Sequence, residues 1–399
     1  MKYLVIICNG LSDKPVAERS NKTPLQLANK PNLDRMAHDG LTGSVCTIPE
    51  NLSAGRDVSY LSLLGYDAEK YYSGHAPFEA SALGIELLED EVALCCDFIF
   101  LQSSHDDMIM KDFTAGRLTD EDSGLLLTAM NEKIQGEVQF YPGRGWHNIM
   151  VIKSPPFRER LLPPHELIGE GLRQFLTSEG SGKELAYIMN QAQIILHHHP
   201  YNKEKVKKGL DAVNSVWIWG NGQLQDLPKF KDMFGKQASL ISASLLFEGM
   251  ADKAGIKHVQ VEGATGGLES NFKGKVSAAL KELEEQDIVY LNIAAAEDIS
   301  LKGNIDEKIK AIEKIDNEVI GPLQKELDAR KNFRMMVVEN HLSSVNFMKY
   351  HKDPVPFVIY PPPKNADKVQ KYDEEIVQDS STHFKSGHSL IEDFLQNKL

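Results

Sequence analysis

The chain alternates short apolar runs with helical patterns at both of its ends, and this alternation constrains the fold more than any other feature. Tyr3–Cys8 is an unbroken apolar run that ends at Asn9-Gly10, as expected for a buried parallel strand leading into a turn. Thr23-Pro24 then supplies an N-cap and a first helical residue. A further strand is predicted over residues 43–48. The order strand, helix, strand predicts a parallel sheet covered by helices on both faces.

The same order returns in the C-terminal part of the chain. β-rich runs predict strands at residues 239–243, 258–261, 288–293, 335–338 and 356–359. Helical patterns separate these runs at residues 245–253, 277–285 and 305–328. The last of them places isoleucine, valine and leucine on one face at three- and four-residue intervals. We therefore expect the two ends of the chain to build one doubly wound, mostly parallel α/β core.

The middle of the chain follows a different order. Strand-like runs at residues 92–101, 137–141 and 149–153 are interrupted by a helical pattern at 119–133, and another helix is predicted at 185–198. This order predicts an α+β domain inserted into the core. The expected division is a discontinuous core of residues 1–72 and 231–399 and an inserted domain of residues 73–230.

Composition and charge exclude several classes of protein. The chain has 399 residues, 42% of them hydrophobic, which is enough for two domains with buried cores. Its net charge of −13 argues against partners that are nucleic acids or anionic membranes. The apolar run at the N-terminus is shorter than a signal-peptide core, and no stretch approaches the ~18 apolar residues of a membrane span. We expect a cytoplasmic protein.

The cysteines and a histidine tract suggest no metal site by their spacing. Cys8, Cys46, Cys95 and Cys96 form no CxxC pair, so spacing predicts neither a zinc site nor a disulfide framework. Buried thiols in a reducing compartment are the expected state. Residues 197–199 are three adjacent histidines at the end of a predicted helix. Adjacent helical side chains point in different directions, so these are expected to be surface residues.

Five longer segments carry a family pattern: KTPLQLANKPNLDRMAHDG, SYLSLLGYDAEKYYSG, EASALGIEL, VEGATGG and DPVPFVIY. Together they resemble the archaeal-type, 2,3-bisphosphoglycerate-independent phosphoglycerate mutases of the alkaline phosphatase superfamily. The resemblance implies a fold of alkaline-phosphatase type with an inserted lid domain. It also implies two divalent metal ions, Mn or Mg, about 4 Å apart. In the family a serine takes the phosphoryl group from the substrate and returns it to the neighbouring hydroxyl.

Most of the positions that match the family's catalytic residues hold other side chains here. Arg56 stands at the position of the nucleophilic serine, ahead of Asp57-Val58. The metal-ligand positions hold Asn9, Glu297, Leu301, Asn340, His341 and Tyr350. Of the family's groups, only His341 is kept outright and only Glu297 conservatively. With −1 from Glu297 and +1 from Arg56, two dications would have almost no anionic ligands. We therefore expect no metal at this site.

The positions that bind substrate in the family are changed as well. The arginine expected before EASALGIEL is His75, and the charged position after FYPG is His147. Glu248 stands where the family has a lysine, and Gln223 where it has an arginine, whereas Arg117 is kept. Anion recognition depends on Arg and Lys side chains, and this chain retains few of them.

The sequence therefore predicts a phosphoglycerate mutase-like protein that has lost metal-dependent phosphoryl transfer. Such a protein needs no cofactor and binds a small phosphorylated ligand or an unidentified protein partner. Taken singly, the residues also have structural explanations: Asn9 as a turn cap, and His341 as a hydrogen-bonded core histidine.

Two alternatives stay open. The first is an active enzyme, either a mutase that converts 3-phosphoglycerate to 2-phosphoglycerate or a phosphotransferase such as a homoserine kinase-like enzyme. A local shift that brings Asp298 or His351 into the site would favour it. The second is a scaffold in which the cleft is a relic.

Overall fold

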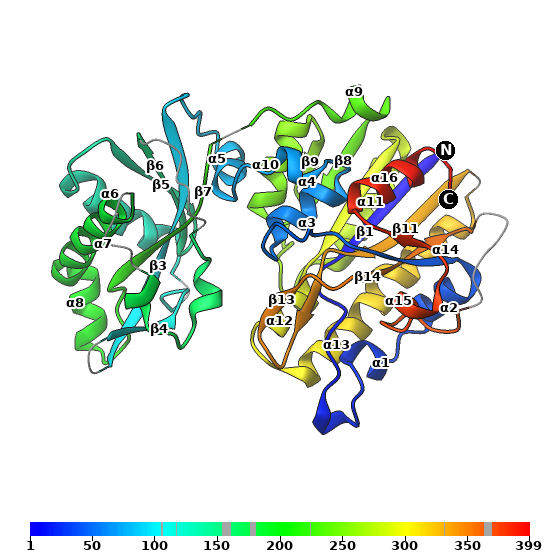
Figure 1. Cartoon of the computed structure of the whole chain (residues 1–399), viewed down its shortest axis with the longest axis horizontal. Helices are drawn as coiled ribbons and strands as arrows, with labels where there is room; N and C mark the ends of the chain where they lie inside the picture. Colours follow the sequence, from blue (N-terminus) through cyan, green and yellow to red (C-terminus); the bar gives the residue numbers. More distant parts are fainter. Residues whose placement is uncertain are drawn as a thin grey trace. The chain divides into compact units, whose positions relative to one another are not determined.

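The computed structural model describes residues 1–104, 107–116, 118–153, 161–175, 181–223, 225–330, 332–362 and 369–399 (Figure 1). The chain divides into two compact units. Unit 1 comprises Met1–Tyr72 and Asp226–Leu399, and unit 2 comprises Ser73–Gln225. Among the helices that the structure describes, none has the length and apolar character needed to span a bilayer.

Unit 1 is built on an eight-stranded sheet. In spatial order its strands are β15 (His383–Phe384), β2 (Leu41–Val45), β14 (Val355–Tyr360), β11 (Phe333–Glu339), β1 (Lys2–Cys8), β10 (Ile288–Ile293), β8 (Ala238–Ile241) and β9 (Lys257–Val259). Strand β14 is antiparallel to both of its neighbours, and the other adjacent pairs are parallel. The predicted mostly parallel α/β sheet is confirmed. The reversed β14 was not predicted, because a strand buried on both faces reads the same in either direction.

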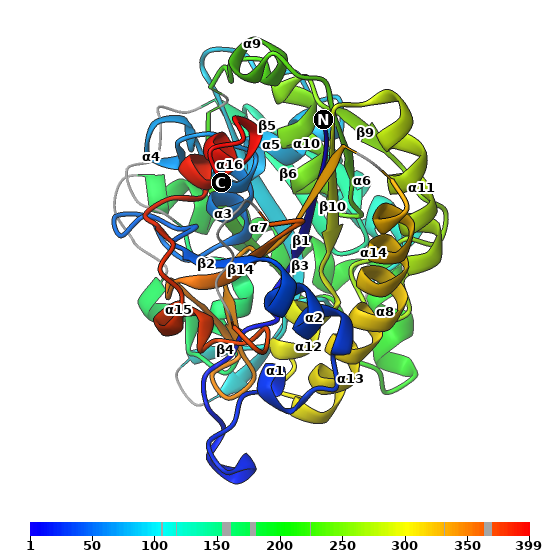
Figure 2. The same cartoon turned by 90° about the vertical axis from the view of Figure 1, so that its right-hand side faces the viewer.

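Helices cover both faces of this sheet, as β1 shows. Alternate side chains of a strand point to opposite faces. Leu4 and Ile6 join a core with α2 (Pro31–Asp39) and α11 (Phe272–Glu285). On the opposite face, the Tyr3 ring packs edge-on against Phe394 of α16 (Gly387–Leu395), with ring centroids 5.3 Å apart. Figure 2 shows α16 on one side of β1 and α11 on the other.

The remaining elements of unit 1 are short, apart from one long helix. They are α1 (Pro24–Leu27), α3 (Arg56–Leu63), α4 (Ala68–Tyr71), α9 (Phe230–Phe234), α10 (Leu245–Ala254), α12 (Ala295–Ser300), α13 (Ile305–Ile315), α14 (Gly321–Asp328), α15 (Ile376–Asp379) and the hairpin β12 (Leu342–Ser344) and β13 (Lys349–His351). Asp316–Ile320 is a π-helical turn between α13 and α14, so the helix predicted over 305–328 is continuous, with one shift in hydrogen-bond register. The predicted Thr23 cap forms a capping box with Gln26.

Unit 2 is an antiparallel sheet with helices on both faces. Its strands run in the order β4 (Asp107–Asp112), β3 (Glu91–Ser104), β6 (His147–Lys153) and β5 (Val138–Arg144), and β7 (Ser215–Gly222) also pairs with β3. Helices α6 (Asp120–Lys133) and α7 (Ser181–His198) share one core with this sheet, and α8 (Pro200–Lys207) follows α7. Helix α5 (Ala76–Ala82) packs on the sheet in a separate, smaller cluster.

Candidate functional site

Several of the residues that the sequence places at catalytic positions meet at one edge of the unit 1 sheet. Strand β1 lies between β10 and β11 and is parallel to both, so their carboxyl ends share an edge (Figure 1). Asn9 directly follows β1, Glu297 lies in α12 just after β10, and Asn340-His341 follows β11. Arg56 begins α3, with Gly55 as its N-cap.

A buried carboxylate, Glu297, lies at the centre of this site. The Asn9 amide donates to Glu297 Oε2 at 2.5 Å and to the Tyr60 hydroxyl oxygen at 2.5 Å. On the other oxygen, Oε1, Arg56 Nε lies at 3.3 Å and His341 Nε2 at 3.8 Å. The site therefore contains an ion pair in which a guanidinium faces the retained acid.

Burial and neighbouring charges set the protonation states of these groups. The Glu297 side chain is 3% exposed and that of Arg56 is 40% exposed. Burial alone would raise the pKa of Glu297, but Arg56 and His341, with Tyr350 and Asn9, bring it below its ordinary value. Burial lowers the pKa of His341 to about 4, so its imidazole is neutral at pH 7. Arg56 and Glu297 thus cancel each other's charge.

The other predicted positions contribute shape rather than charge. The Tyr350 ring packs on His341 with centroids 4.2 Å apart. Asn340 Oδ1 accepts from the backbone N–H of His341 at 2.8 Å, and among the described residues its amide nitrogen has no hydrogen-bond partner. Leu301 follows the last residue of α12, four residues after Glu297, and has no polar side-chain atom to offer.

Further residues, which the sequence analysis did not single out, hold the side chains of this site in place. Asn292 Nδ2 donates to Asn9 Oδ1 at 2.8 Å, and Lys275 Nζ donates to the Asn292 carbonyl at 3.0 Å. The Tyr60 ring stacks on Phe247 at 4.1 Å. Of these residues, only Asn292 could have been found from the sequence, because it is a polar residue inside the apolar run that forms β10.

The residues of this site do not fit the pair of divalent ions that the family uses. Hard dications need several anionic oxygens or neutral imidazoles that converge on them. Among the predicted ligand positions, Glu297 is the one carboxylate and His341 the one imidazole. The fixed charge of Arg56 lies 3.3 Å from the Glu297 oxygen that His341 approaches at 3.8 Å. Among the described residues, unit 1 contains no group of three or more His, Cys, Asp or Glu side chains arranged to hold a metal.

The site also lacks an activated hydroxyl at the nucleophile position. A guanidinium stays protonated in proteins and does not act as a nucleophile. The next hydroxyl along α3, Ser59, donates to the backbone carbonyls of Gly55 at 3.1 Å and Arg56 at 3.3 Å.

His75 and His147, which the resemblance predicts at substrate-binding positions, both belong to unit 2. His75 is the N-cap of α5, and His147 is the first residue of β6. They meet at Glu79, where His75 Nε2 lies 3.2 Å from one carboxylate oxygen and His147 Nε2 contacts the other. Burial opposes charge on His147, but Asp97 and Glu79 raise the pKa of its imidazole well above its ordinary value. Arg117 lies outside the described residues.

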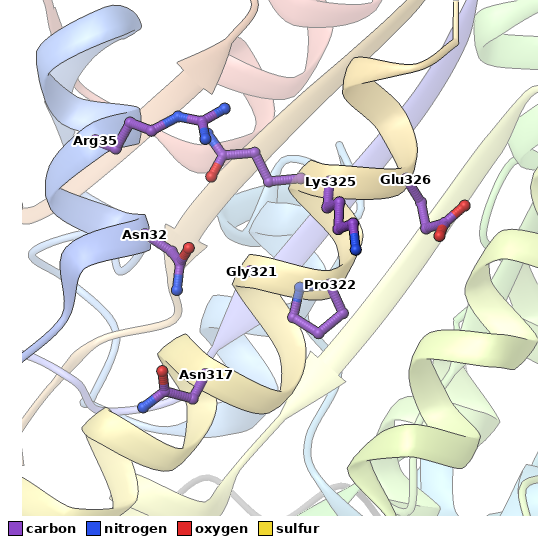
Figure 3. A pocket seen from close by; sticks show the side chains of 8 residues that line it. Asn32, Arg35, Asn317, Gly321, Pro322, Lys325 and Glu326 are labelled. Carbon is purple, nitrogen blue, oxygen red and sulfur yellow. The ribbon is translucent and has the colours of Figure 1, made fainter.

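A surface pocket in unit 1 contains none of the predicted site residues. It lies between α2 and the π-turn and α14 segment (Figure 3) and is lined by Asn32, Arg35, Asn317, Gly321, Pro322, Gln324, Lys325 and Glu326. Arg35 Nη2 donates to Asp328 at 2.5 Å. We assign no ligand to this pocket.

Comparisons with known proteins agree with the resemblance seen in the five segments. A family model described as 2,3-bisphosphoglycerate-independent phosphoglycerate mutase matches residues 37–202. A probable 2,3-bisphosphoglycerate-independent phosphoglycerate mutase of Geobacter sulfurreducens is 34% identical over 98% of this chain and 99% of its own length. A mutase so named in Methanothrix thermoacetophila is 36% identical, with 98% of each chain covered.

Solved structures extend this similarity to the fold. A protein of Pyrococcus horikoshii has a TM-score of 0.79 at 25% identity and covers 100% of this chain and 98% of its own. A cofactor-independent phosphoglycerate mutase of Thermoplasma acidophilum has a TM-score of 0.60 at 26% identity, with 100% of each chain covered. The similarity therefore spans both units.

Proposed function

This chain belongs to the 2,3-bisphosphoglycerate-independent phosphoglycerate mutase family, and from that premise we propose that it is a mutase-like protein that no longer performs metal-dependent phosphoryl transfer. The observation that carries the proposal is the ion pair of Arg56 with Glu297 at 3.3 Å. In this proposal the protein binds a small phosphorylated ligand or a protein partner, and it is located in the cytoplasm. Its four free cysteines suit a reducing compartment.

The ion pair supports the proposal for a chemical reason. Phosphoryl transfer through a phosphoserine needs a hydroxyl that a cation or a base has activated. In this chain the nucleophile position holds a cation, and its charge is already neutralised by Glu297. The Asn9 amide, which donates to the same carboxylate at 2.5 Å, has the shape of an aspartate without its charge.

An active mutase is the second candidate, and the names of the relatives favour it. The similar proteins of Geobacter and Methanothrix carry the name phosphoglycerate mutase at 34% and 36% identity over 98% of this chain. For the active reading to hold, metal ligands would have to come from residues other than those at the family's positions. A homoserine kinase-like phosphotransferase meets the same requirement and is tested in the same way.

The deciding experiment follows interconversion of 3-phosphoglycerate and 2-phosphoglycerate by the purified full chain, with manganese or magnesium added. The Geobacter relative, assayed in parallel, serves as the positive control. We expect no turnover above background from this chain. Metal-dependent turnover at a rate near that of the relative would overturn the proposal, and phosphorylation of homoserine in the presence of ATP would do so as well.

A further inference from the structure

A second group of ionisable side chains lies in unit 2. His75, Glu79, Cys95 and His147 each offer one nitrogen, oxygen or sulfur atom, and these atoms lie within 4.8 Å of one another. Among the described residues, they form the only group of this kind. We infer that these four side chains, called the α5 cluster below, bind a zinc ion that ties α5 to the sheet of unit 2.

The backbone brings the four residues to one face of the sheet. His75 and Glu79 are four residues apart at the start of α5, so they share a face of that helix. Cys95 and Asp97 are two residues apart in β3 and point to the same side of the sheet. His147 lies opposite Asp97 in the neighbouring strand β6. The cluster thus joins one helix and two strands.

Two imidazoles already point at one carboxylate. His75 Nε2 lies 3.2 Å from Glu79 Oε1, and His147 Nε2 makes a short contact with Glu79 Oε2. The Cys95 sulfur lies 4.0 Å from that second oxygen. Neighbouring ligands of a tetrahedral zinc ion are about 3.3–3.8 Å apart, given its bond lengths to nitrogen and sulfur. Small side-chain shifts therefore suffice to place all four around one ion.

The remaining ring nitrogen of His147 is held by an outer group. Its Nδ1 contacts Asp97 Oδ1, and the Trp219 indole N–H donates to Asp97 Oδ2 at 2.8 Å. A carboxylate that holds the second nitrogen of a histidine is the usual support of a zinc-bound imidazole, because it fixes the ring and directs Nε2 at the metal.

The donor set suits zinc in charge and in chemistry. A Glu79 carboxylate and a Cys95 thiolate together supply −2, which neutralises Zn²⁺, while both imidazoles bind in their neutral form. Binding exchanges the metal for two protons, one from the Cys95 thiol and one from the His147 imidazolium. The side chains of His75 and His147 are 10% and 20% exposed, against 6% for Glu79, so an ion can enter from the histidine side.

A glycine in β7 leaves room for the cluster. Gly220 has φ +63°, and a Cβ atom there would lie 3.0 Å from His75 Cβ and 3.2 Å from Cys95 Sγ. Its carbonyl accepts from the backbone N–H of His75 at 3.1 Å, which fixes the start of α5. A residue with a side chain at this position would press against two of the four proposed ligands.

Helix α5 gains from such a link because the residues that it buries in this cluster, Ala76 and Ala80, are small. The buried cluster beneath it contains Ala76, Ala80, Ala93, Cys95, Ile149 and Val151. Alanine side chains bury little area, so they contribute less to stability than larger apolar residues. A structural zinc ion adds its binding free energy to folding. The inference does not rest on the proposed function, since all four ligands belong to unit 2.

The competing explanation is a network without metal, in which a charged His147 bridges Glu79 and Asp97. The test is zinc titration of the full chain after chelation, without a histidine tag, against a competing chelator. We expect one zinc ion per chain. Cobalt substitution should give thiolate-to-cobalt absorbance, which reports a sulfur ligand directly.

Variants of matched residues separate the two explanations. Cys95→Ala should abolish the thiolate-to-cobalt absorbance and weaken zinc binding by about 100-fold or more. Cys96→Ala removes the adjacent buried thiol, which belongs to the core on the opposite face of β3, and should change neither. His198→Gln and Glu297→Gln should also leave zinc binding unchanged, since they test the exposed histidine tract and the site in unit 1.

Should Cys95→Ala fail to fold, Asp97→Asn provides a second test. It leaves all four ligands in place and should weaken zinc binding by about 10- to 100-fold. The inference is overturned if the wild-type chain binds no zinc stoichiometrically, or if Cys95→Ala keeps the wild-type cobalt spectrum. Loss of binding on His198→Gln would equally overturn it. None of these outcomes depends on mutase activity.

Discussion

At the scale of single residues, the ion pair of Arg56 with the buried Glu297 is the main feature of the site in unit 1. Arg56 reaches the Glu297 carboxylate at 3.3 Å, with 40% of its own side chain exposed. A cation that is partly in water can offset the desolvation of a buried acid at lower cost than a fully buried one. Asn9 then satisfies the second carboxylate oxygen at 2.5 Å.

This arrangement predicts strong coupling between Arg56 and Glu297. Arg56→Met leaves the carboxylate without its cation, so the free energy of unfolding should fall by about 1–2 kcal/mol, less than for a fully buried pair. Glu297→Gln in the same chain should restore most of the loss, because it removes the unpaired charge. Urea unfolding of the two single variants and the double variant measures the coupling.

The surface pair of Arg35 with Asp328, at 2.5 Å, supplies a matched control. Because that arginine is 50% exposed, Arg35→Met should cost less than about 1 kcal/mol. Additive effects of the Arg56 and Glu297 substitutions would mean that the two side chains do not act as a pair in solution.

The sequence anticipated much of this site, for a physical reason. Parallel strands end at the same edge, so Asn9 after β1 and His341 after β11 had to approach each other. It did not reveal that Tyr60 shares the Asn9 amide, because that contact depends on where α3 begins. Neither α3 nor α12 was predicted, since helices of 8 and 6 residues carry too short a pattern.

At the scale of elements, unit 2 contains a group of possible metal ligands that spacing along the sequence does not predict. The α5 cluster draws ligands from α5, β3 and β6. Only His75 and Glu79, at i and i+4 on α5, have the close spacing of a zinc motif, and Cys95 and His147 are far from them in the sequence. The spacing of the four cysteines could not reveal this cluster, because Cys95 is the one cysteine in it. Strand pairing, which places His147 beside Asp97, brings the ligands together instead.

The approach of β7 to α5 leads to a prediction about Gly220. Gly220→Ala strains a backbone with φ +63° and also places a Cβ atom 3.0 Å from His75 Cβ. Gly209 has φ +68° with no atom within 4 Å of a Cβ built there, so Gly209→Ala measures the backbone strain alone, about 1 kcal/mol. Gly220→Ala should cost at least about 1 kcal/mol more and should weaken zinc binding. If Gly220→Ala and Gly209→Ala lowered the free energy of unfolding equally, β7 would move to accommodate the Cβ atom without disturbing the cluster.

At the scale of the whole molecule, the fold of the family surrounds a site in which Arg56 and Glu297 cancel each other's charge. The similarity to the solved mutase of Thermoplasma covers 100% of both chains, so the proposed inability to bind metal should lie in the site residues and not in the scaffold. If so, the site can be rebuilt by substitution.

Rebuilding the family's pattern predicts a gain of manganese binding. The change combines Arg56→Ser, Asn9→Asp and Asn340→Asp with Leu301→His and Tyr350→His. Two added carboxylates and the loss of Arg56 take the site from net zero to −3, which favours divalent ions. Calorimetric titration should show manganese binding that the wild-type chain lacks at this site, and Glu297→Gln in the rebuilt chain should weaken it. If the rebuilt chain bound no more manganese than the wild-type chain, the scaffold, and not these five side chains, would be what prevents metal binding.

The buried Lys275, which contacts Asn292 beside the unit 1 site, should make the free energy of unfolding change with pH in the alkaline range. Lys275 is 1% exposed, and burial lowers its pKa to about 8 from 10.5. Between these values the unfolded chain binds the proton and the folded chain does not, so stability rises as pH increases through the interval. Below about pH 8 the lysine is charged in both states, and its contribution stays at the lower level.

Substitution of Lys275 measures how much this residue contributes to the increase in the free energy of unfolding with pH. Lys275→Met removes the titrating group, so the unfolding free energy of the wild type relative to the variant should increase between pH 7 and 10.5, by as much as about 3 kcal/mol. The exposed Lys281 lies on the same helix, α11, and Lys281→Met should leave the slope unchanged. The Lys275 amine donates to the backbone carbonyls of Asn292 at 3.0 Å and Thr265 at 3.5 Å. Lys275→Met also removes these hydrogen bonds at every pH, which shifts the whole stability curve without changing its slope. A wild-type-to-variant difference that stays constant with pH would mean that water reaches this amine and keeps it charged.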